Sequence, residues 1–148
     1  MAIEIMLRRH LGALRAINAM GEEQIADLPS NVVFKAVLTS QKPRSITYFN
    51  KFFALLTVLY PHQSYYPTML KFRKAVTIAL GFAEETVLPS GKVMVEAESI
   101  AWHKMKEEDF EQLMKRFFEL AETRILPGID RKDVEREWEE VMKGYGNG

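Results

Sequence analysis

The residues with the clearest chemical potential are cations in the middle of the chain. Between residues 28 and 83 there are seven basic side chains and no Asp or Glu, although the 148-residue chain carries 20 basic and 20 acidic residues in all. Basic side chains neutralise phosphates and release counterions, and they also bind carboxylates. The stretch therefore predicts a positive surface that binds DNA or an acidic protein. Burial would also make charges rare here, but it would not explain why all seven share one sign.

Aromatic residues beside these cations extend the predicted binding surface. Aromatic faces can stack bases where strands are single, and Arg44 and Lys51 lie seven positions apart, on one face of an expected helix. A solvated basic face without a ligand, with His62 packed against neighbouring rings, is the alternative. The candidate residues for binding DNA or an acidic partner are Lys42, Arg44, Lys51, Lys71, Arg73, Lys74, Tyr48, Tyr65, Tyr66 and His62. We expect the six basic side chains to gather on one accessible surface.

Carboxylates dominate the C-terminal part of the chain. Residues 84–148 carry sixteen acidic and ten basic side chains. An acidic surface of this kind suits a DNA mimic that binds a host protein, such as a bacterial defence complex. Solvated helix faces would produce the same spacing. The candidate residues for this alternative are Glu135, Glu139 and Glu140.

Motifs that mark common catalytic sites are missing from the sequence. There is no GxxxxGK[ST] or GxGxxG phosphate cradle and no HExxH, and with three His and no Cys a zinc site is not expected. We therefore expect a binding protein without catalytic residues, metal or cofactor. A nuclease that uses converging carboxylates and a metal ion is kept as a third hypothesis.

The lack of cysteine also bears on the compartment. A chain without Cys fits the reducing cytoplasm. No apolar run reaches the roughly 20 residues that span a bilayer. We expect a protein of the host-cell cytoplasm that does not enter a membrane.

Strands and helices segregate along the sequence instead of alternating. The patterns predict a hairpin from residues 2–8 and the segment after Gly12, a strand over 31–39 and a hairpin over 84–99. Helices are expected over 21–28, from Ser45 as N-cap to Pro61, from Pro67 to about 80, over 106–125, and over 130–143 with Asp130 as N-cap. The sequence therefore predicts one α+β domain over 1–148, with a flexible tail at 144–148. In it a small antiparallel sheet of two hairpins plus one strand packs against about four helices.

Five segments resemble an uncharacterised family of proteins from tailed phages and prophages. They are LGAL at 11–14, PRSITYFNKFFALL at 43–56, the FRK to GF stretch at 72–82, residues 105–113, and the LPG turn at 126–128 with Arg131 and Asp133. The resemblance covers nearly the whole chain. It implies a phage setting and brings no established activity with it.

The pair Arg44–Ser45, followed by Lys51, is similar to a pattern in the phage lambda NinB (Orf) recombination-mediator family. The Gln-Asn pair of that family is not reproduced, because Tyr48 and Phe49 stand there. The similarity implies a dimeric α+β protein that binds DNA and single-strand-binding protein and helps to load a recombinase without catalysis.

Two functional hypotheses follow. The first is a phage accessory protein of DNA recombination or replication that binds DNA, or a DNA-bound host protein such as single-strand-binding protein, through the basic residues. The second is a phage-encoded inhibitor of a host defence complex that acts through its acidic C-terminal third. The tyrosine-rich loop and the Phe-rich helix also predict a homo-oligomer, most simply a dimer.

Overall fold

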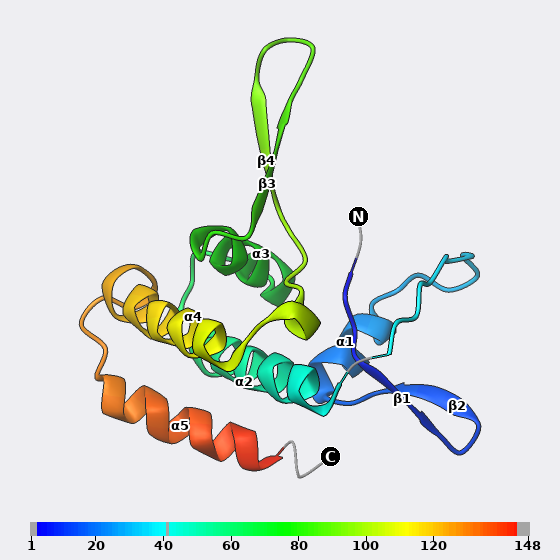
Figure 1. Ribbon diagram of the computed structural model, residues 1–148, viewed down its shortest axis with the longest axis horizontal. Helices are drawn as coiled ribbons and strands as arrows, with labels where there is room; N and C mark the ends of the chain where they lie inside the picture. The colour runs from blue at the N-terminus through cyan, green and yellow to red at the C-terminus, as the bar shows by residue number, and fades with distance from the viewer. Residues whose placement is uncertain (1–2, 41, 145–148) are drawn as a thin grey trace.

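Five α-helices and two β-hairpins follow one another in the computed structural model, which describes residues 3–40 and 42–144 (Figure 1). The predicted α+β class is confirmed. The elements are β1 (Leu7–His10), β2 (Ala13–Ala16), α1 (Ala19–Ala26), α2 (Pro43–Leu59), α3 (Met69–Ala79), β3 (Ala83–Val87), β4 (Val93–Ala97), α4 (Glu107–Leu120) and α5 (Arg131–Gly144). Short 3-10 turns stand at Tyr60–His62 and Trp102–Lys104, and a π-helical turn at Ala121–Ile125 extends α4. The predicted flexible tail lies, apart from Gly144, outside the described residues.

Helix α2 is the centre of the core. Its residues 52–56 are all buried, and Leu55, Leu56 and Leu59 have no exposed surface. A helix that is apolar on nearly every side must be surrounded by other elements. The ring of Phe52 lies 5.2 Å from that of Phe117 in α4 and 5.3 Å from that of Trp102. Phe52, Trp102 and Phe117 thus belong to one buried aromatic core.

The beginnings of α2 and α3 differ from the prediction. Lys42 is the N-cap residue of α2 and Pro43 opens the helix, because a fixed φ without an N–H suits the first turn. Ser45 is therefore no N-cap: it lies inside the helix, buried, and its hydroxyl has no hydrogen-bond partner among the described residues. Helix α3 is capped by Thr68, whose side chain accepts from the N–H of Lys71 at 3.2 Å. Pro67 thus precedes the cap.

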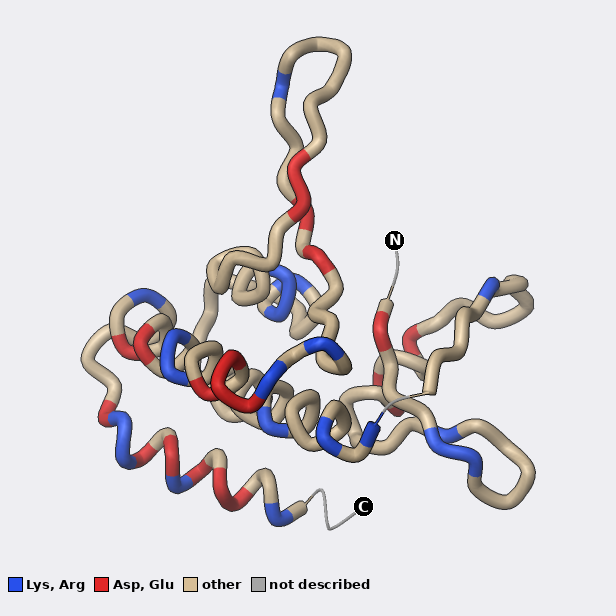
Figure 2. The backbone as a smooth tube through the Cα atoms, viewed as in Figure 1, with Lys and Arg blue, Asp and Glu red and all other residues tan. Residues whose placement is uncertain are grey.

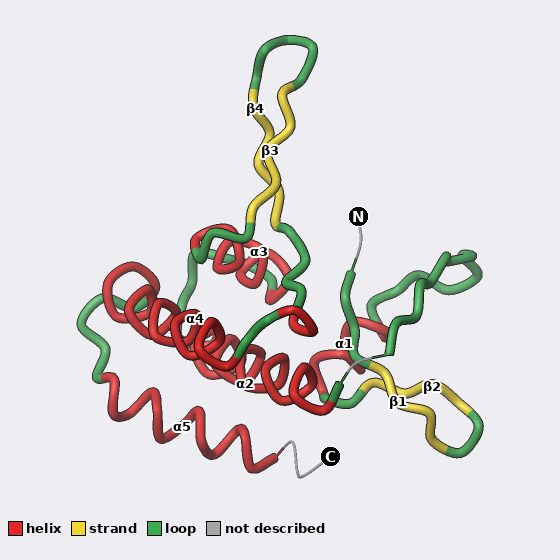
Figure 3. Tube along the Cα trace, viewed as in Figure 1, coloured by secondary structure: helices red, strands yellow, loops and turns green. Residues whose placement is uncertain are grey.

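The two hairpins stand apart from each other and project from the helical body, where β2 contacts α1 and β4 contacts α3 (Figures 1 and 3). Among the described residues, β1 pairs only with β2 and β3 pairs only with β4, both antiparallel. Both predicted hairpins form, but the first strand runs over 7–10 and not 2–8, and the hairpins do not share a sheet. Their strands are exposed on both faces over most of their length.

The strand predicted over residues 31–39 does not form. Residues 31–40 are all exposed and run out from α1 and back towards α2 as an irregular loop (Figure 1). The sequence is rich in Val, but β-propensity reflects packing on a neighbouring strand. The described part of the chain offers this segment no such neighbour.

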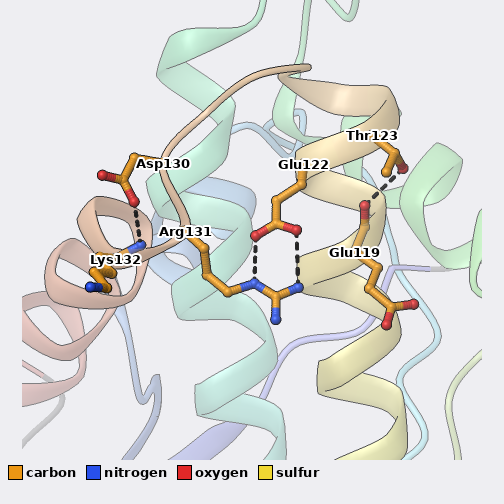
Figure 4. A network of polar contacts seen from close by, with 6 residues as sticks. All are labelled: Glu119, Glu122, Thr123, Asp130, Arg131 and Lys132. Atoms are coloured by element: carbon orange, nitrogen blue, oxygen red, sulfur yellow. Dashed lines mark hydrogen bonds and ion pairs between the residues drawn. The ribbon is translucent and has the colours of Figure 1, made fainter.

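Polar contacts fix the turn that carries the chain from α4 to α5 (Figure 4). The guanidinium of Arg131 donates to both carboxylate oxygens of Glu122, at 2.5 and 3.2 Å. The Asp130 carboxylate accepts from the N–H of Lys132 at 2.9 Å, which agrees with the capping role predicted for Asp130. These contacts position α5 along α2, where the indole N–H of Trp138 donates to a backbone carbonyl of α2 at 2.8 Å.

Membrane insertion through a helix finds no support in the described part of the chain. None of its helices is both long enough and apolar enough to cross a bilayer.

Truncation of the central ring tests this core. We expect Phe52→Ala to lower the free energy of unfolding by about 3–5 kcal/mol, because it leaves a cavity beside Trp102 and Phe117. Val33→Ala, at a side chain that is 98 % exposed, should change it by less than about 0.5 kcal/mol. Urea denaturation followed by circular dichroism measures both. Equal effects of the two substitutions would contradict the arrangement described.

Candidate nucleic-acid interface

Two of the predicted basic residues lie at the beginning of α2. Lys42 and Arg44 are exposed, and the first turn of the helix carries no acidic side chain. The guanidinium of Arg44 lies 5.9 Å from the centre of the Tyr48 ring. Neither cation forms an ion pair with a described residue. Both are therefore available to an anionic partner.

Lys51 lies further along α2, on the side that faces α4 and α5. Its ammonium group is 6.0 Å from the centre of the Phe110 ring, and its backbone carbonyl accepts the Trp138 indole N–H. The residue is only partly exposed. Lys51 thus serves the packing of the helices as well as the surface charge.

The three basic residues of α3 occupy a different place. Arg73 lies with its guanidinium 5.6 Å from the centre of the Phe53 ring, and one of its terminal nitrogens is buried without a hydrogen-bond partner. Lys71 is exposed and Lys74 is half-buried. Arg73 and Lys74, with Glu4 and Trp102, border a cavity of about 550 Å³.

Burial governs the two charged groups at this cavity. It raises the pKa of the Glu4 carboxyl, and the nearby positive charge of Arg73 only partly offsets the rise. Burial likewise lowers the pKa of the Arg73 guanidinium, against the attraction of Glu4. Arg73 is therefore a partly desolvated charge held among apolar groups, and not a freely exposed phosphate ligand.

The predicted basic residues do not converge on one surface. Lys51 faces Phe110, whereas Arg73 packs on Phe53. Each residue of an α-helix is rotated by about 100° from the one before, so the side chains of residues 51 and 53 leave the helix in nearly opposite directions. The side chains of Lys51 and Arg73 therefore lie on opposite sides of α2. The expectation of a single basic surface is wrong, because α3 packs on one side of α2 while Lys51 points to the other side.

The aromatic candidates divide into core and surface residues. Tyr48 is only 5 % exposed and stacks on Phe110, with 4.1 Å between the ring centres, so it is not available to stack a base. Tyr66 is half-buried, and its backbone N–H donates to the Gln63 side chain. Tyr65, at 85 % exposure, is the accessible ring of the pair.

His62 and the acidic candidates meet near α5. A ring nitrogen of His62 lies 3.8 Å from a carboxylate oxygen of Glu137, and both side chains are more than half exposed. Glu135, Glu139 and Glu140 are exposed, and Glu140 pairs with Lys143. Acidic and basic residues alternate along α5 (Figure 2), so this helix presents a mixed surface and not a uniformly negative one.

A second group of cations, which the sequence analysis did not single out, lies on the hairpin β1–β2. Arg8, Arg9 and Arg15 are exposed, and none forms an ion pair with a described residue. Arg8 stands directly opposite Arg15 across the two strands. Like charges in this position destabilise a hairpin, so they are not explained by its folding. We call the hairpin β1–β2, which carries these three arginines, the cationic hairpin.

The tip of the cationic hairpin is a two-residue turn. Leu11 and Gly12 connect His10 to Ala13, with φ values of 50° and 80°. Two successive positive φ angles are typical of a type I′ turn, which holds two strands in a tight, twisted ribbon. Leu11 is 87 % exposed in a conformation that branched and bulky residues rarely adopt. The turn thus fixes the register that sets Arg8 against Arg15.

The sequence does contain a signal for this group. No Asp or Glu occurs between Glu4 and Glu22, while three Arg and one His do. The charge total over residues 1–27 hides this signal, because the four acidic residues Glu4, Glu22, Glu23 and Asp27 outnumber the three arginines. The last three of these acids belong to α1 and to its C-cap, a separate element.

A metal centre has no basis in the described residues. Among residues 3–40 and 42–144, no three His, Cys, Asp or Glu side chains come close enough together to hold a metal ion.

One comparison with known proteins gives a match. A family model described as "Protein of unknown function (DUF1367)" matches residues 61–140, which span α3, β3, β4, α4 and most of α5. Neither a curated protein nor a solved structure matches the chain. The matched residues do not include the cationic hairpin.

The charged pair at the cavity gives a prediction about pH. Because the folded state raises the pKa of Glu4, the folded chain loses stability as the pH rises through that value. We therefore expect Glu4→Gln to raise the free energy of unfolding at neutral pH. The gain should shrink as the pH falls and Glu4 becomes protonated in the unsubstituted chain.

Denaturant titrations over a pH series measure this difference, with Glu139→Gln, at an exposed site, as the control. A less stable Glu4→Gln variant at neutral pH would mean that the attraction to Arg73 outweighs the cost of burial.

Proposed function

Since the chain belongs to the DUF1367 family of proteins of unknown function, its role must be inferred from its own surface, and we propose that it binds DNA without catalysing a reaction. The observation that carries this proposal is the cationic hairpin. Three exposed arginines, none of them ion-paired with a described residue, stand on a narrow two-stranded ribbon that projects from the helices (Figure 2). Such an arrangement places cations where a large polyanion can reach them.

The two-stranded form of the hairpin and its exposure support DNA as the ligand. The major groove of B-DNA admits a two-stranded β-ribbon, and arginine contacts both phosphates and base edges. The ribbon is exposed along both strands, so the body of the protein does not obstruct its entry into a groove. Lys42 and Arg44 supply further exposed cations where α2 begins.

The resemblance of residues 43–56 to phage proteins motivates the biological context that we propose. A non-catalytic DNA-binding protein would serve phage recombination or replication as an accessory factor in the host cytoplasm, where single-strand-binding protein would also be available as a partner. The alternative, an inhibitor of a host defence complex, requires a negative surface. The mixed charges of α5 give it less support than the cationic hairpin gives DNA binding.

Salt dependence of binding tests the proposal. We expect a short labelled duplex to bind with an affinity that falls steeply between about 50 and 200 mM salt. The variant Arg8→Ala/Arg9→Ala/Arg15→Ala should bind more weakly, and its slope of log K against log salt should be smaller by about 2–3, because three phosphate contacts are lost. Fluorescence anisotropy measures both quantities, and the same titration with a single strand distinguishes the two DNA forms.

The control removes the same number of exposed cations elsewhere. Lys115→Ala/Arg124→Ala/Lys132→Ala changes the net charge equally on α4, its π-helical extension and α5, and should leave the salt slope nearly unchanged. Binding that does not depend on salt, or an equal loss in the control variant, would refute the hairpin as the DNA-binding site.

A further inference from the structure

The loop between α1 and α2 carries an unusual concentration of exposed apolar side chains. Val32, Val33, Phe34, Val37 and Leu38 are each at least half exposed. A soluble chain rarely presents so many apolar residues in one short segment unless something binds them. We call residues 32–39 the apolar arm.

The backbone of residues 32–38 within the apolar arm is also unpaired among the described residues. Residues 32–38 make no hydrogen bond to any described residue, through either backbone or side chain. The arm contains no Pro and a single charge, Lys35. Unpaired N–H and C=O groups beside β-branched side chains are a template for pairing with another strand.

We propose that the apolar arm pairs antiparallel with the same arm of a second copy of this chain, around a two-fold axis at Ala36. A two-fold axis through an antiparallel pair places one residue opposite its own copy. With Ala36 on the axis, Phe34 faces Leu38, Val33 faces Thr39, and Lys35 faces Val37. Phe34 then meets an apolar partner, and Val33 meets a β-branched one.

Charge excludes the register centred one residue earlier. A register centred on Lys35 would set two ammonium groups against each other, which destabilises a strand pair. The register centred on Ala36 separates them, and it puts the smallest side chain of the arm at the axis. Because side chains alternate along a strand, Val32, Phe34, Ala36 and Leu38 of both copies then form one continuous apolar face. This register thus avoids a direct Lys–Lys pair and brings the apolar side chains of the two arms together.

The arm must straighten to pair in this way. In the single chain it runs out and back (Figure 1), and residues 32–38 have no hydrogen bond to a described residue that would hold them extended. The second copy supplies the hydrogen bonds that a strand requires. This inference stands on the arm alone and does not depend on DNA binding, so either can fail without the other.

Cysteine cross-linking tests the axis directly, because the chain has no Cys of its own. Opposite residues in an antiparallel pair have Cα atoms about 4.5–5.5 Å apart, which is within the range of a disulfide. We expect Ala36→Cys to form a covalent dimer rapidly under oxidised glutathione, as seen on a non-reducing gel. Ser90→Cys, in the exposed turn of hairpin β3–β4, is the control and should cross-link far more slowly.

Sedimentation velocity over a concentration series tests the apolar contacts. The mass of the unsubstituted protein should rise from one chain towards two, while Phe34→Ser/Leu38→Ser should remain at one chain. Val87→Ser/Val93→Ser removes an equally exposed apolar pair from hairpin β3–β4 and should still dimerise. Circular dichroism confirms that each variant is folded.

Three results would overturn the proposal. One is a single-chain mass at every concentration. Another is loss of the dimer in Val87→Ser/Val93→Ser with retention in Phe34→Ser/Leu38→Ser, which would assign the interface to hairpin β3–β4. The third is cross-linking of Ala36→Cys no faster than that of Ser90→Cys.

Discussion

The structure depends on the burial of helix α2 on nearly all its sides. Residues 52–56 have almost no exposed surface, and the rings of Trp102, Phe110 and Phe117 close around the helix. One helix thereby gathers most of the apolar contacts that the chain can offer. The other helices pack against α2, and the segments that do not reach it have little core of their own. Both hairpins and the apolar arm are exposed for this reason.

Periodicity predicted most of the fold because the helices obey it. The spacing of Phe49, Phe52, Phe53 and Leu56 marks a face that α2 indeed buries, and alternation in residues 92–96 marks β4. Local pattern could not reveal what each element packs against. The Val-rich segment 31–39 has the composition of a strand but no neighbour in the described chain. Ser45 has the chemistry of a cap, but Pro43 opens the helix two residues earlier.

The sequence could predict that the candidate site is basic, but it could not predict where on the molecule the basic side chains lie. An excess of cations in the first half of the chain is evident from the sequence, and exposed cations are present. Sequence distance could not show that Lys51 and Arg73 would pack on different sides of α2, each over an aromatic ring. Nor could it show that Tyr48 would stack inside the core. The cationic hairpin was not predicted, because the charge total over residues 1–27 combines its three arginines with the acidic residues of α1 and its C-cap.

The two proposals together account for how so small a hairpin could bind DNA usefully. Three arginines neutralise only a few phosphates, so one hairpin alone gives weak, salt-sensitive binding. The hairpin and the apolar arm project to the same side of the molecule in Figure 1, away from α4 and α5. Pairing through the arm would present two cationic hairpins from one assembly, and binding of the second would then be intramolecular. The repulsion of Arg8 and Arg15 weakens the hairpin when it is free, and on the proposed function DNA phosphates would relieve it. On this view the like-charged pair is tolerated because its ligand, and not the fold, neutralises it.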